Sequence, residues 1–308
     1  MKKMIFQKAG NAVEERIVLK SSLHTHTTNS DGNFTPAQII DMYKDAGFDV
    51  INFSDHSVMN KVSEYDGKGM TLISGIELHP MGPRGIRWHI LAVGVQEDFA
   101  DTMPLTGQQA VDSAVLNGAA VFCAHPYWCG FTSDEVMQLE RIAGIEVYNT
   151  SCRYIGKEFN MYAWDACLDA GKIYNAIAVD DIHEKCDFCG GWTMICAKSN
   201  MQKDIIEALK TGYFYSTQGP EFSKIVVNEG VLELEFTKCA SAVLIGRGAS
   251  GKSIMIEQPG GPGTSGEVSE VKIELKDCPK GFFRIQLRDF DGKYAWTNPI
   301  YNPNDIQC

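Results

Sequence analysis

Short apolar strand patterns alternate with helical patterns from residue 17 to about residue 216, and this alternation constrains the fold more than any other feature of the sequence. It is typical of parallel strands joined by crossover helices, and about seven such units favour a closed barrel over an open sheet. The expected strands cover 17–26, 50–56, 71–78, 86–95, 119–126, 145–149, 172–181 and 192–198, and the expected helices cover 35–47, 106–118, 132–144, 158–171 and 200–212.

The helix over 35–47 has the clearest boundaries. Thr35 can cap its first turn, Pro36 suits the first helical position, and Gly47 can end it.

The pattern changes near Phe222, where helical patterns stop. Short strand patterns separated by turns containing glycine, proline or aspartate cover 222–236, 241–246, 252–258, 269–275 and 282–301. The stretches "VVNEGVLEL" and "RDFDGKYAW" are typical of hairpins, and the composition of 257–267 predicts a flexible loop. We therefore predict two domains, a barrel over residues 1–221 and a small antiparallel β-sandwich over residues 222–308.

The formal net charge of −11 argues against a protein that binds long nucleic acids through their backbones. No apolar run approaches the length of about 18 residues that spans a bilayer, and the start of the chain is too short in apolar residues for a signal peptide. We therefore expect a cytoplasmic protein without a membrane partner. The ten cysteines are scattered, so no disulfide framework is expected, and the single CxxC pair, Cys186 and Cys189, lacks the second pair of a structural zinc site.

All seven histidines lie in the alternating region, and most of them lie at or just after the end of an expected strand. Those positions are His24 and His26, then His56, His125 and His183, with Glu77 ending another strand. In an α/β barrel the carboxyl ends of the strands meet at one rim, so residues distant in sequence should meet in space.

Each of these elements by itself has an ordinary structural explanation. An HxH pair points both side chains to one face of a strand, but many such pairs are polar surface residues. His89 has apolar neighbours typical of a core histidine, and His79 falls outside the pattern and is expected to be structural. Six of the seven histidines, together with acidic residues at successive strand ends, nevertheless indicate a metal site.

The motifs "HTH", "SDG", "SDH", "GIE", "HP" and "DIH" occur in this order, and over residues 20–218 the chain resembles the PHP (polymerase and histidinol phosphatase) superfamily. The ending "AWTNPIY" after a β-domain is similar to the subgroup that contains a carbaryl-hydrolase-like branch. The resemblance implies an α/β fold with a distorted (β/α)7 TIM-like barrel and a trinuclear metal site.

Carried over by position, the resemblance implies three groups of ligands for two to three divalent ions, which would be Zn, Mn or Fe. The first group is His24, His26, Glu77 and Asp181; the second shares Glu77 and adds His89 and His125; the third is Asp31, His56 and His183. Relatives have a small residue where this chain has Asp180, so Asp180 either supports the site or competes with Asp181 as the ligand. The Asp-x-His spacing favours Asp181, because alternate residues of a strand share one face.

Two such ions would lower the pKa of a bridging water enough to supply hydroxide near neutral pH, with Glu77 as the bridging ligand, and the third would bind phosphate oxygens. Asp55 is expected to orient a ligand histidine. Substrate contacts are expected from residues at or near the strand ends, although each of these could also be a solvated or packing residue. They are Arg153, Asn149 and Tyr127, with Arg84 and Arg87 in the loop before His89.

The resulting hypothesis is a metal-dependent phosphoesterase, that is, a hydrolase acting on a small phosphorylated metabolite or nucleotide. Two alternatives stay open: a hydrolase of a nonphosphate ester or carbamate, and a noncatalytic metal-bound module whose β-domain binds a partner. The short segment between His89 and His125 leaves little room for an inserted domain, which further disfavours a long nucleic-acid substrate. The β-domain could cap the barrel, form a homo-oligomer or bind its own ligand.

Overall fold

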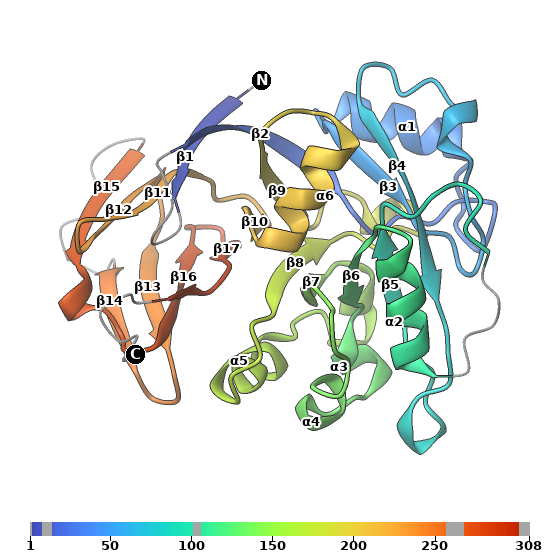
Figure 1. The fold of residues 1–308 in the computed structure, drawn as a ribbon. Helices are drawn as coiled ribbons and strands as arrows, with labels where there is room; N and C mark the ends of the chain where they lie inside the picture. Colours follow the sequence, from blue (N-terminus) through green and yellow to red (C-terminus); the bar gives the residue numbers. More distant parts are fainter. Residues whose placement is uncertain (1, 8–13, 101–105, 257–267, 302–308) are drawn as a thin grey trace.

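The computed structural model describes residues 2–7, 14–100, 106–256 and 268–301. Strands dominate, and the helices are few and short (Figure 1). The helices are α1 Pro36–Asp45, α2 Gly107–Leu116, α3 Pro126–Cys129, α4 Ser133–Val136, α5 Met161–Asp169 and α6 Gln202–Thr211. Short 3-10 helices cover Val62–Glu64, Pro83–Gly85, Ser151–Ile155, Lys185–Asp187 and Leu275–Asp277.

The N-terminal part of the chain contributes ten strands. They are β1 Lys2–Gln7, β2 Glu14–Ser22, β3 Val50–Phe53, β4 Thr71–Leu78, β5 Ile90–Val93, β6 Ala120–Cys123, β7 Gly144–Asn149, β8 Asn175–Val179, β9 Trp192–Ala197 and β10 Phe214–Thr217. From β10 to β8 their hydrogen-bonded order is β10-β9-β2-β3-β4-β5-β6-β7-β8.

The strand directions are mixed, which differs from the uniformly parallel strands expected. Pairs β2–β3, β3–β4, β6–β7 and β7–β8 are parallel, whereas β5 is antiparallel to both of its neighbours and β9 is antiparallel to β2 and β10. Only a loop with one 3-10 turn joins β4 to β5, and such a short connection suits an antiparallel pair, because a parallel pair needs a longer crossover. The sheet of the N-terminal part is therefore mixed, with both parallel and antiparallel strand pairs.

The edge of β8 opposite β7 is bonded by side chains. The N–H of Ala176 donates to Asn298 Oδ1 (2.8 Å), and its carbonyl accepts from Ser216 Oγ (2.6 Å). The carbonyl of Ala178 accepts from Thr193 Oγ1 (3.0 Å). Side chains from β9, β10 and the C-terminal tail thus take the place of a further neighbouring strand in bonding the backbone of β8. The pattern of hydrophobic residues in the sequence does not reveal such bonds.

Asn298 also ties the tail to the end of α6, because its Nδ2 donates to the carbonyls of Gly212 (3.1 Å) and Phe214 (3.0 Å). Replacing this buried residue in Asn298→Ala would deprive one N–H and two carbonyls of their partner. We expect a loss of about 2–4 kcal/mol in the free energy of unfolding, measured in urea. The exposed Asn200→Ala serves as the control, and an equal stability for both variants would contradict this role of the tail.

The helix predicted over 35–47 is confirmed with its cap. Thr35 Oγ1 accepts from the N–H of Gln38 in a capping box, and Pro36 occupies the first turn. The helix predicted over 132–144 instead ends at Val136 as α4. Beyond it the backbone bonds to other elements: the carbonyl of Leu139 accepts from Tyr174 Oη (2.8 Å), and the N–H of Glu140 donates to Gln108 Oε1 (2.8 Å).

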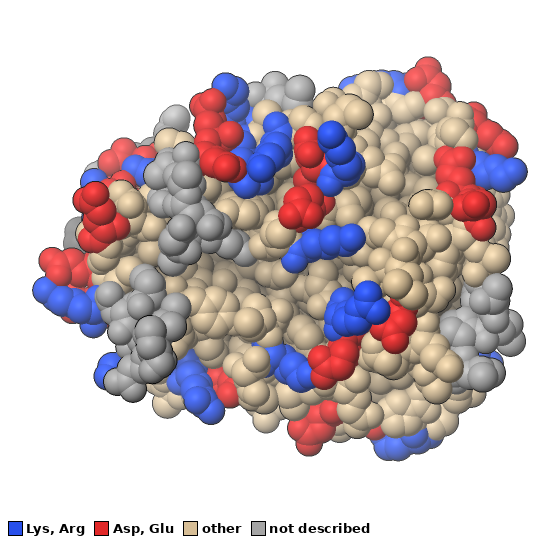
Figure 2. Space-filling view, viewed as in Figure 1, with Lys and Arg blue, Asp and Glu red and all other residues tan. Residues whose placement is uncertain are grey.

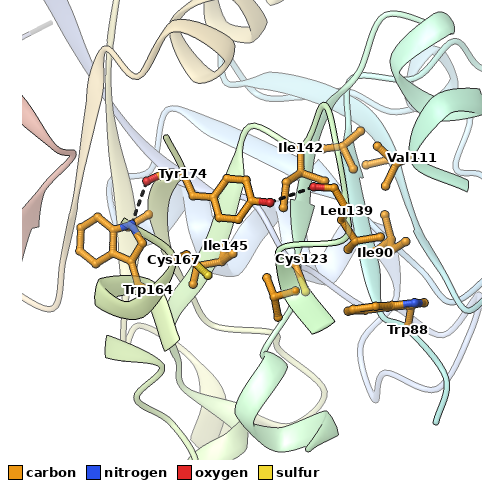
Figure 3. Close-up of a cluster of buried hydrophobic side chains, with 14 of the residues drawn as sticks. Trp88, Ile90, Val111, Cys123, Leu139, Ile142, Ile145, Trp164, Cys167 and Tyr174 are labelled. Carbon is orange, nitrogen blue, oxygen red and sulfur yellow. Dashed lines mark hydrogen bonds between the residues drawn. The ribbon is translucent and has the colours of Figure 1, made fainter. Parts of the chain in front are cut away.

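The first of these bonds belongs to a buried hydrophobic cluster formed mainly by β4–β8 and the helices that cover them (Figure 3). Trp164 Nε1 of α5 donates to the carbonyl of Tyr174 (2.8 Å), so the two aromatic side chains link α5, β8 and the segment after α4. Trp88 and Phe131 stack with their ring centroids 3.8 Å apart at the other end of the cluster. The bonds of Tyr174 thus tie α5 to the amino end of β8, and the Trp88–Phe131 stack ties the segment after α3 to the segment before β5.

The described residues of the C-terminal part form strands and turns, with one 3-10 turn, Leu275–Asp277. They are β11 Phe222–Asn228, β12 Val231–Thr237, β13 Ser241–Gly246, β14 Gly251–Ile256, β15 Val268–Glu274, β16 Phe282–Arg288, β17 Tyr294–Thr297 and β18 Ile300–Tyr301. All pairs among them are antiparallel, and both predicted hairpins, β11–β12 and β16–β17, are present. Residues of β11, β12, β13, β16 and β17 share one core. The predicted flexible loop 257–267 lies outside the described residues.

The two parts of the chain are joined by strand pairing as well as by sequence. β1 pairs in parallel with β11 and antiparallel with β2, and β17 pairs antiparallel with β10. In Figure 1, β1 accordingly lies with the C-terminal strands, beside the N-terminal sheet. The boundary between residues 221 and 222 stays a prediction.

Candidate metal centre

The strand predicted over 17–26 ends at Ser22, and the HxH segment continues from it as an irregular extension. Thr25 forms a parallel bridge with Ile182, and the N–H of Asp181 donates to the carbonyl of His24 (3.1 Å). A second parallel bridge joins His56 to Glu77. These backbone links bring the segments after β2, β3 and β8 and the end of β4 together, so their polar side chains converge.

Four buried atoms form the middle of this convergence. His26 Nε2 lies 3.0 Å and His24 Nε2 lies 3.2 Å from Asp181 Oδ1, and both nitrogens lie 3.5 Å from Glu77 Oε2. None of these four atoms has a hydrogen-bond partner among the described residues. Two buried imidazole nitrogens and two carboxylate oxygens therefore lie close together without satisfying one another, which is unusual for buried polar groups, and Glu77 Oε2 also lies 2.7 Å from His56 Nδ1.

The other carboxylate oxygen of Glu77 faces a second pair of histidines. Glu77 Oε1 lies 2.8 Å from His89 Nδ1 and 3.4 Å from His125 Nε2. Burial raises the pKa of Glu77, but the neighbouring His24 and His89 lower it more, and the net pKa lies well below the ordinary value. Glu77 is thus an ionised carboxylate shared by two groups of histidines.

A third group lies nearer the surface. Asp31 Oδ2 is 3.3 Å from His56 Nε2, and Asp31 Oδ1 is 3.4 Å from His183 Nε2. The ring of His26 lies between this group and the buried four atoms, with its centroid 4.3 Å from that of His56 and 4.2 Å from that of His183. All nine residues of the expected ligand set therefore lie within one cluster, and their role as ligands stays a prediction.

Three further residues belong to this cluster. His79 Nε2 is 3.0 Å from His56 Nδ1 and 3.4 Å from Glu77 Oε2, so His79 lies at the site rather than away from it. The two-residue spacing from Glu77 was the available signal, because it places both side chains on one face of an extended segment. Cys129 Sγ lies 3.5 Å from His125 Nδ1, one helical turn along α3.

Glu146 is the third residue that the sequence reasoning missed. It is buried in β7, where its Oε1 lies 2.6 Å from His24 Nδ1 and its Oε2 accepts from the N–H of His125 (2.9 Å). The carboxylate can hold Nδ1 of His24 and so fix the orientation of the ring, with Nε2 toward Asp181 and Glu77. Burial lowers the pKa of His24, but Asp181, Glu146 and Glu77 together raise it well above the ordinary value. The signal was a charged residue inside the apolar run "IEVYN".

The two adjacent aspartates have separate surroundings. Asp180 is buried and accepts five hydrogen bonds, from Tyr43, Thr150, Cys189, Gly190 and Gly191. Burial raises the pKa of Asp180 to about 6, against the opposing effect of these donors. The side chain of Asp181 instead faces His24 and His26, from a left-handed backbone with a φ of 53°. A left-handed turn, rather than regular strand alternation, separates the two carboxylates.

Asp55 supports a loop instead of contacting a histidine. Its Oδ1 accepts from the N–H of Thr27 (2.7 Å) and from Ser30 Oγ (2.6 Å), and its Oδ2 accepts from Thr27 Oγ1 (2.8 Å) and Asn60 Nδ2 (2.5 Å). These bonds shape the turn between His26 and Asp31, so Asp55 acts on the backbone that carries the ligands.

The residues expected to contact substrate are mostly engaged within the protein. Both polar atoms of the buried Asn149 amide have partners. Its Nδ2 donates to Glu146 and Asp181, and its Oδ1 accepts from the N–H of Cys152. The guanidinium of Arg153 donates to the carbonyls of Thr150 and Cys186. Arg87 donates to the carbonyl of His79 (3.0 Å), and Tyr127 is half-exposed.

Arg84 forms a bidentate pair with Glu135, with Nε–Oε1 and Nη2–Oε2 distances of 2.6 Å. The Arg84 hydrogen bond lowers the pKa of Glu135 from 4.5 to about 2. A depressed carboxyl pKa contributes stability above the unfolded value, and that stability is lost as the pH falls from about 4.5 to about 2. We expect Arg84→Gln to reduce the free energy of unfolding at pH 7, and this difference from wild type to shrink below pH ~4.5. Chemical unfolding of both proteins across this range, with Arg141→Gln as the control, tests it.

Searches with the sequence found no matching family model and no matching curated protein. The fold, however, is similar to that of a two-domain protein from Bacteroides vulgatus that contains a predicted PHP-like metal-dependent phosphoesterase, with a TM-score of 0.53 and 18% identity over 97% of this chain and 98% of that one. An amidohydrolase from Chromobacterium violaceum with bound sulfate and no metal matches 53% of this chain and 87% of its own, with a TM-score of 0.45 and 15% identity.

The chain therefore shares the two-domain α/β fold of the protein from Bacteroides vulgatus. The closed (β/α)7 barrel stays a prediction. Among the described residues, no helix is long and apolar enough to cross a bilayer.

Proposed function

We propose that this protein is a metal-dependent hydrolase of the PHP type, and that it hydrolyses esters of a small phosphorylated metabolite or nucleotide. The observation that carries the proposal is the set of four buried atoms, His24 Nε2, His26 Nε2, Glu77 Oε2 and Asp181 Oδ1, whose nitrogen–oxygen distances are 3.0–3.5 Å and which have no hydrogen-bond partners among the described residues. His24, His26 and Asp181 could hold one divalent cation, and Glu77 with His24 and His125 could hold another, because imidazole and carboxylate ligands suit Zn, Mn or Fe.

Further ions would be held by groups next to this one. Glu77 Oε1, His89 and His125 form the second group, and Asp31, His56 and His183 form the third. The carboxylates of Glu77, Asp181, Asp31 and Glu146 concentrate negative charge here, and bound cations would offset it. Divalent ions would supply Lewis acidity and a hydroxide near neutral pH by lowering the pKa of water that they bind.

The side chains of the protein fix the direction of these ligands. Glu146 holds Nδ1 of His24, so that Nε2 faces the buried group. His183 Nδ1 lies 2.8 Å from the carbonyl of Asp181, which turns Nε2 toward Asp31. A histidine whose other nitrogen donates to an oxygen is held in one tautomer and one orientation, which favours metal binding.

A small substrate is supported by the distribution of charge. Lys and Arg are interspersed with Asp and Glu on the face shown in Figure 2, and no basic stripe crosses the described part of that face. With the net charge of −11, this disfavours a long polyanion and is compatible with a short phosphate ester bound mainly by the cations themselves.

Two measurements on the purified chain test the proposal. We expect elemental analysis to find two to three divalent ions per chain, and a panel of phosphomonoesters, phosphodiesters and carboxyl esters to show metal-dependent phosphoester hydrolysis that chelation abolishes and metal restores. A folded chain that binds no divalent ion would refute a metallohydrolase. Turnover of carboxyl esters alone would refute the phosphoesterase.

A further inference from the structure

A cavity of about 580 Å³ lies between the segment that follows β6 and the start of α5. Its wall includes the aromatic residues Tyr127, Phe131, Phe159 and Tyr162, with Ala163 on α5. Its volume falls within the range of about 300–1,000 Å³ that is typical of small-molecule sites. A small ligand, rather than a peptide or a second chain, matches this volume.

The cavity adjoins the candidate metal centre through α3, which is a single turn. His125 precedes α3 and faces Glu77, whereas Tyr127, two residues later, lines the cavity. Trp128 lies on the side of the histidines, with its ring centroid 5.1 Å from that of His125 and 5.4 Å from that of His89. Residues two apart on a helix lie on different faces, so Tyr127 and His125 lie on the two sides of α3, one toward the cavity and one toward the cluster.

One wall residue has an unused hydrogen-bond donor. Asn160 is 2% exposed, and its Oδ1 accepts from the N–H of Tyr127 (2.7 Å), which sets the orientation of the amide. Its Nδ2 has no hydrogen-bond partner among the described residues. A buried donor without a partner is destabilising, and an acceptor on a ligand would remove that penalty.

The aromatic wall indicates what the rest of the ligand is. Tyr127, Phe159 and Tyr162 are 49%, 40% and 87% exposed, so their rings are open to contact. Phe159 packs on Tyr148 with ring centroids 5.2 Å apart, which holds it in place from behind. Aromatic side chains contact planar rings through offset-stacked or edge-to-face geometries.

We propose that this cavity binds a planar aromatic portion of the substrate, oriented by a ring acceptor such as a carbonyl that pairs with Asn160 Nδ2. The assignment of this ligand to a substrate rests on the proposed hydrolytic function. The binding itself does not, because it depends only on the aromatic wall and on Asn160.

The binding test uses 4-methylumbelliferone, a fused two-ring molecule with a ring carbonyl, measured by calorimetry with the metal-loaded full chain. Asn160→Asp keeps an acceptor for the Tyr127 N–H but removes the donor, and it should raise Kd roughly 5–10-fold. The matched ligand 2-naphthol lacks the ring carbonyl and should lose less affinity. Ala163→Leu fills the cavity and should raise Kd at least about 10-fold, while the exposed Ala37→Leu on α1 should leave it unchanged.

A hydrolysis arm separates this inference from the proposed function. The ratio of kcat/KM for 4-methylumbelliferyl phosphate to that for glycerol phosphate should fall about 10-fold in Ala163→Leu and stay constant in Ala37→Leu. Binding that responds to the variants without hydrolysis of any ester would uphold the cavity and refute the proposed function. Hydrolysis with the same ratio in all variants, or no binding at about 1 mM ligand, would overturn the cavity assignment and leave the proposed function intact.

Discussion

The variant Glu77→Gln is expected to lose most of its bound metal and to lower kcat/KM for any hydrolysed ester by about 10³-fold or more. The physical reason is that the two oxygens of Glu77 face different groups: Oε2 faces His24 and His26, and Oε1 faces His89 and His125. Glutamine has nearly the same shape, but its amide nitrogen is a hydrogen-bond donor without a charge and cannot ligate a cation. One substitution should therefore weaken both neighbouring groups.

Metal content per chain and steady-state kinetics at saturating metal measure this effect. Asp112→Asn, which removes a half-exposed carboxylate on α2 that pairs with Arg141, serves as the control and should keep metal and rate. A Glu77→Gln chain with unchanged metal content would contradict the shared-ligand role of Glu77. Circular dichroism establishes that both variants are folded.

The second large effect separates Asp181 from Asp180. Asp181→Asn should lose metal and activity with little change in stability, because Asp181 Oδ1 faces His24 and His26 and has no hydrogen-bond partner among the described residues. Asp180→Asn should instead unfold at a lower temperature. Its carboxylate accepts five hydrogen bonds, and an asparagine amide would turn a donor toward some of those donors.

We expect Asp180→Asn to lose about 2–4 kcal/mol and to lower Tm by roughly 4–12 °C, while the folded chain keeps its metal. Thermal unfolding with elemental analysis of the same samples measures both quantities. Each variant is the matched control for the other, since the same chemical change is made one residue apart. Metal loss from a folded Asp180→Asn chain, with metal retained in Asp181→Asn, would reverse the assignment.

The residues of the candidate site could largely be predicted, because strand ends in an α/β protein converge. The convergence of strand ends indicated that these residues meet, and the resemblance to the PHP superfamily grouped His24, His26 and Glu77 with Asp181, although these residues are up to 157 positions apart, from 24 to 181. The order of residues along the chain could not predict the direction in which each side chain points. Asp181 turns from Asp180 through a left-handed backbone, and His79 turns toward His56 instead of away.

The expected substrate contacts show the limit of sequence reasoning most clearly. An arginine near a strand end can bind an anion, but Arg84 pairs with Glu135, and Arg153 is held by two backbone carbonyls. These partners lie 51, 3 and 33 residues away along the chain. The partner of each charged side chain depends on tertiary packing, and a local sequence pattern does not predict it.

The sequence by itself determined the alternation of strands and helices, the capped helix α1, the hairpins of the C-terminal part and the gathering of histidines, because each depends on local periodicity, capping or turn chemistry. Only the tertiary structure decided the antiparallel directions of β5 and β9, the pairing of β1 with β11, the bonding of β8 by Asn298, and the buried Glu146 behind His24. Those features depend on contacts between distant segments, where hydrogen bonds and charges are satisfied by whichever group packing brings within reach.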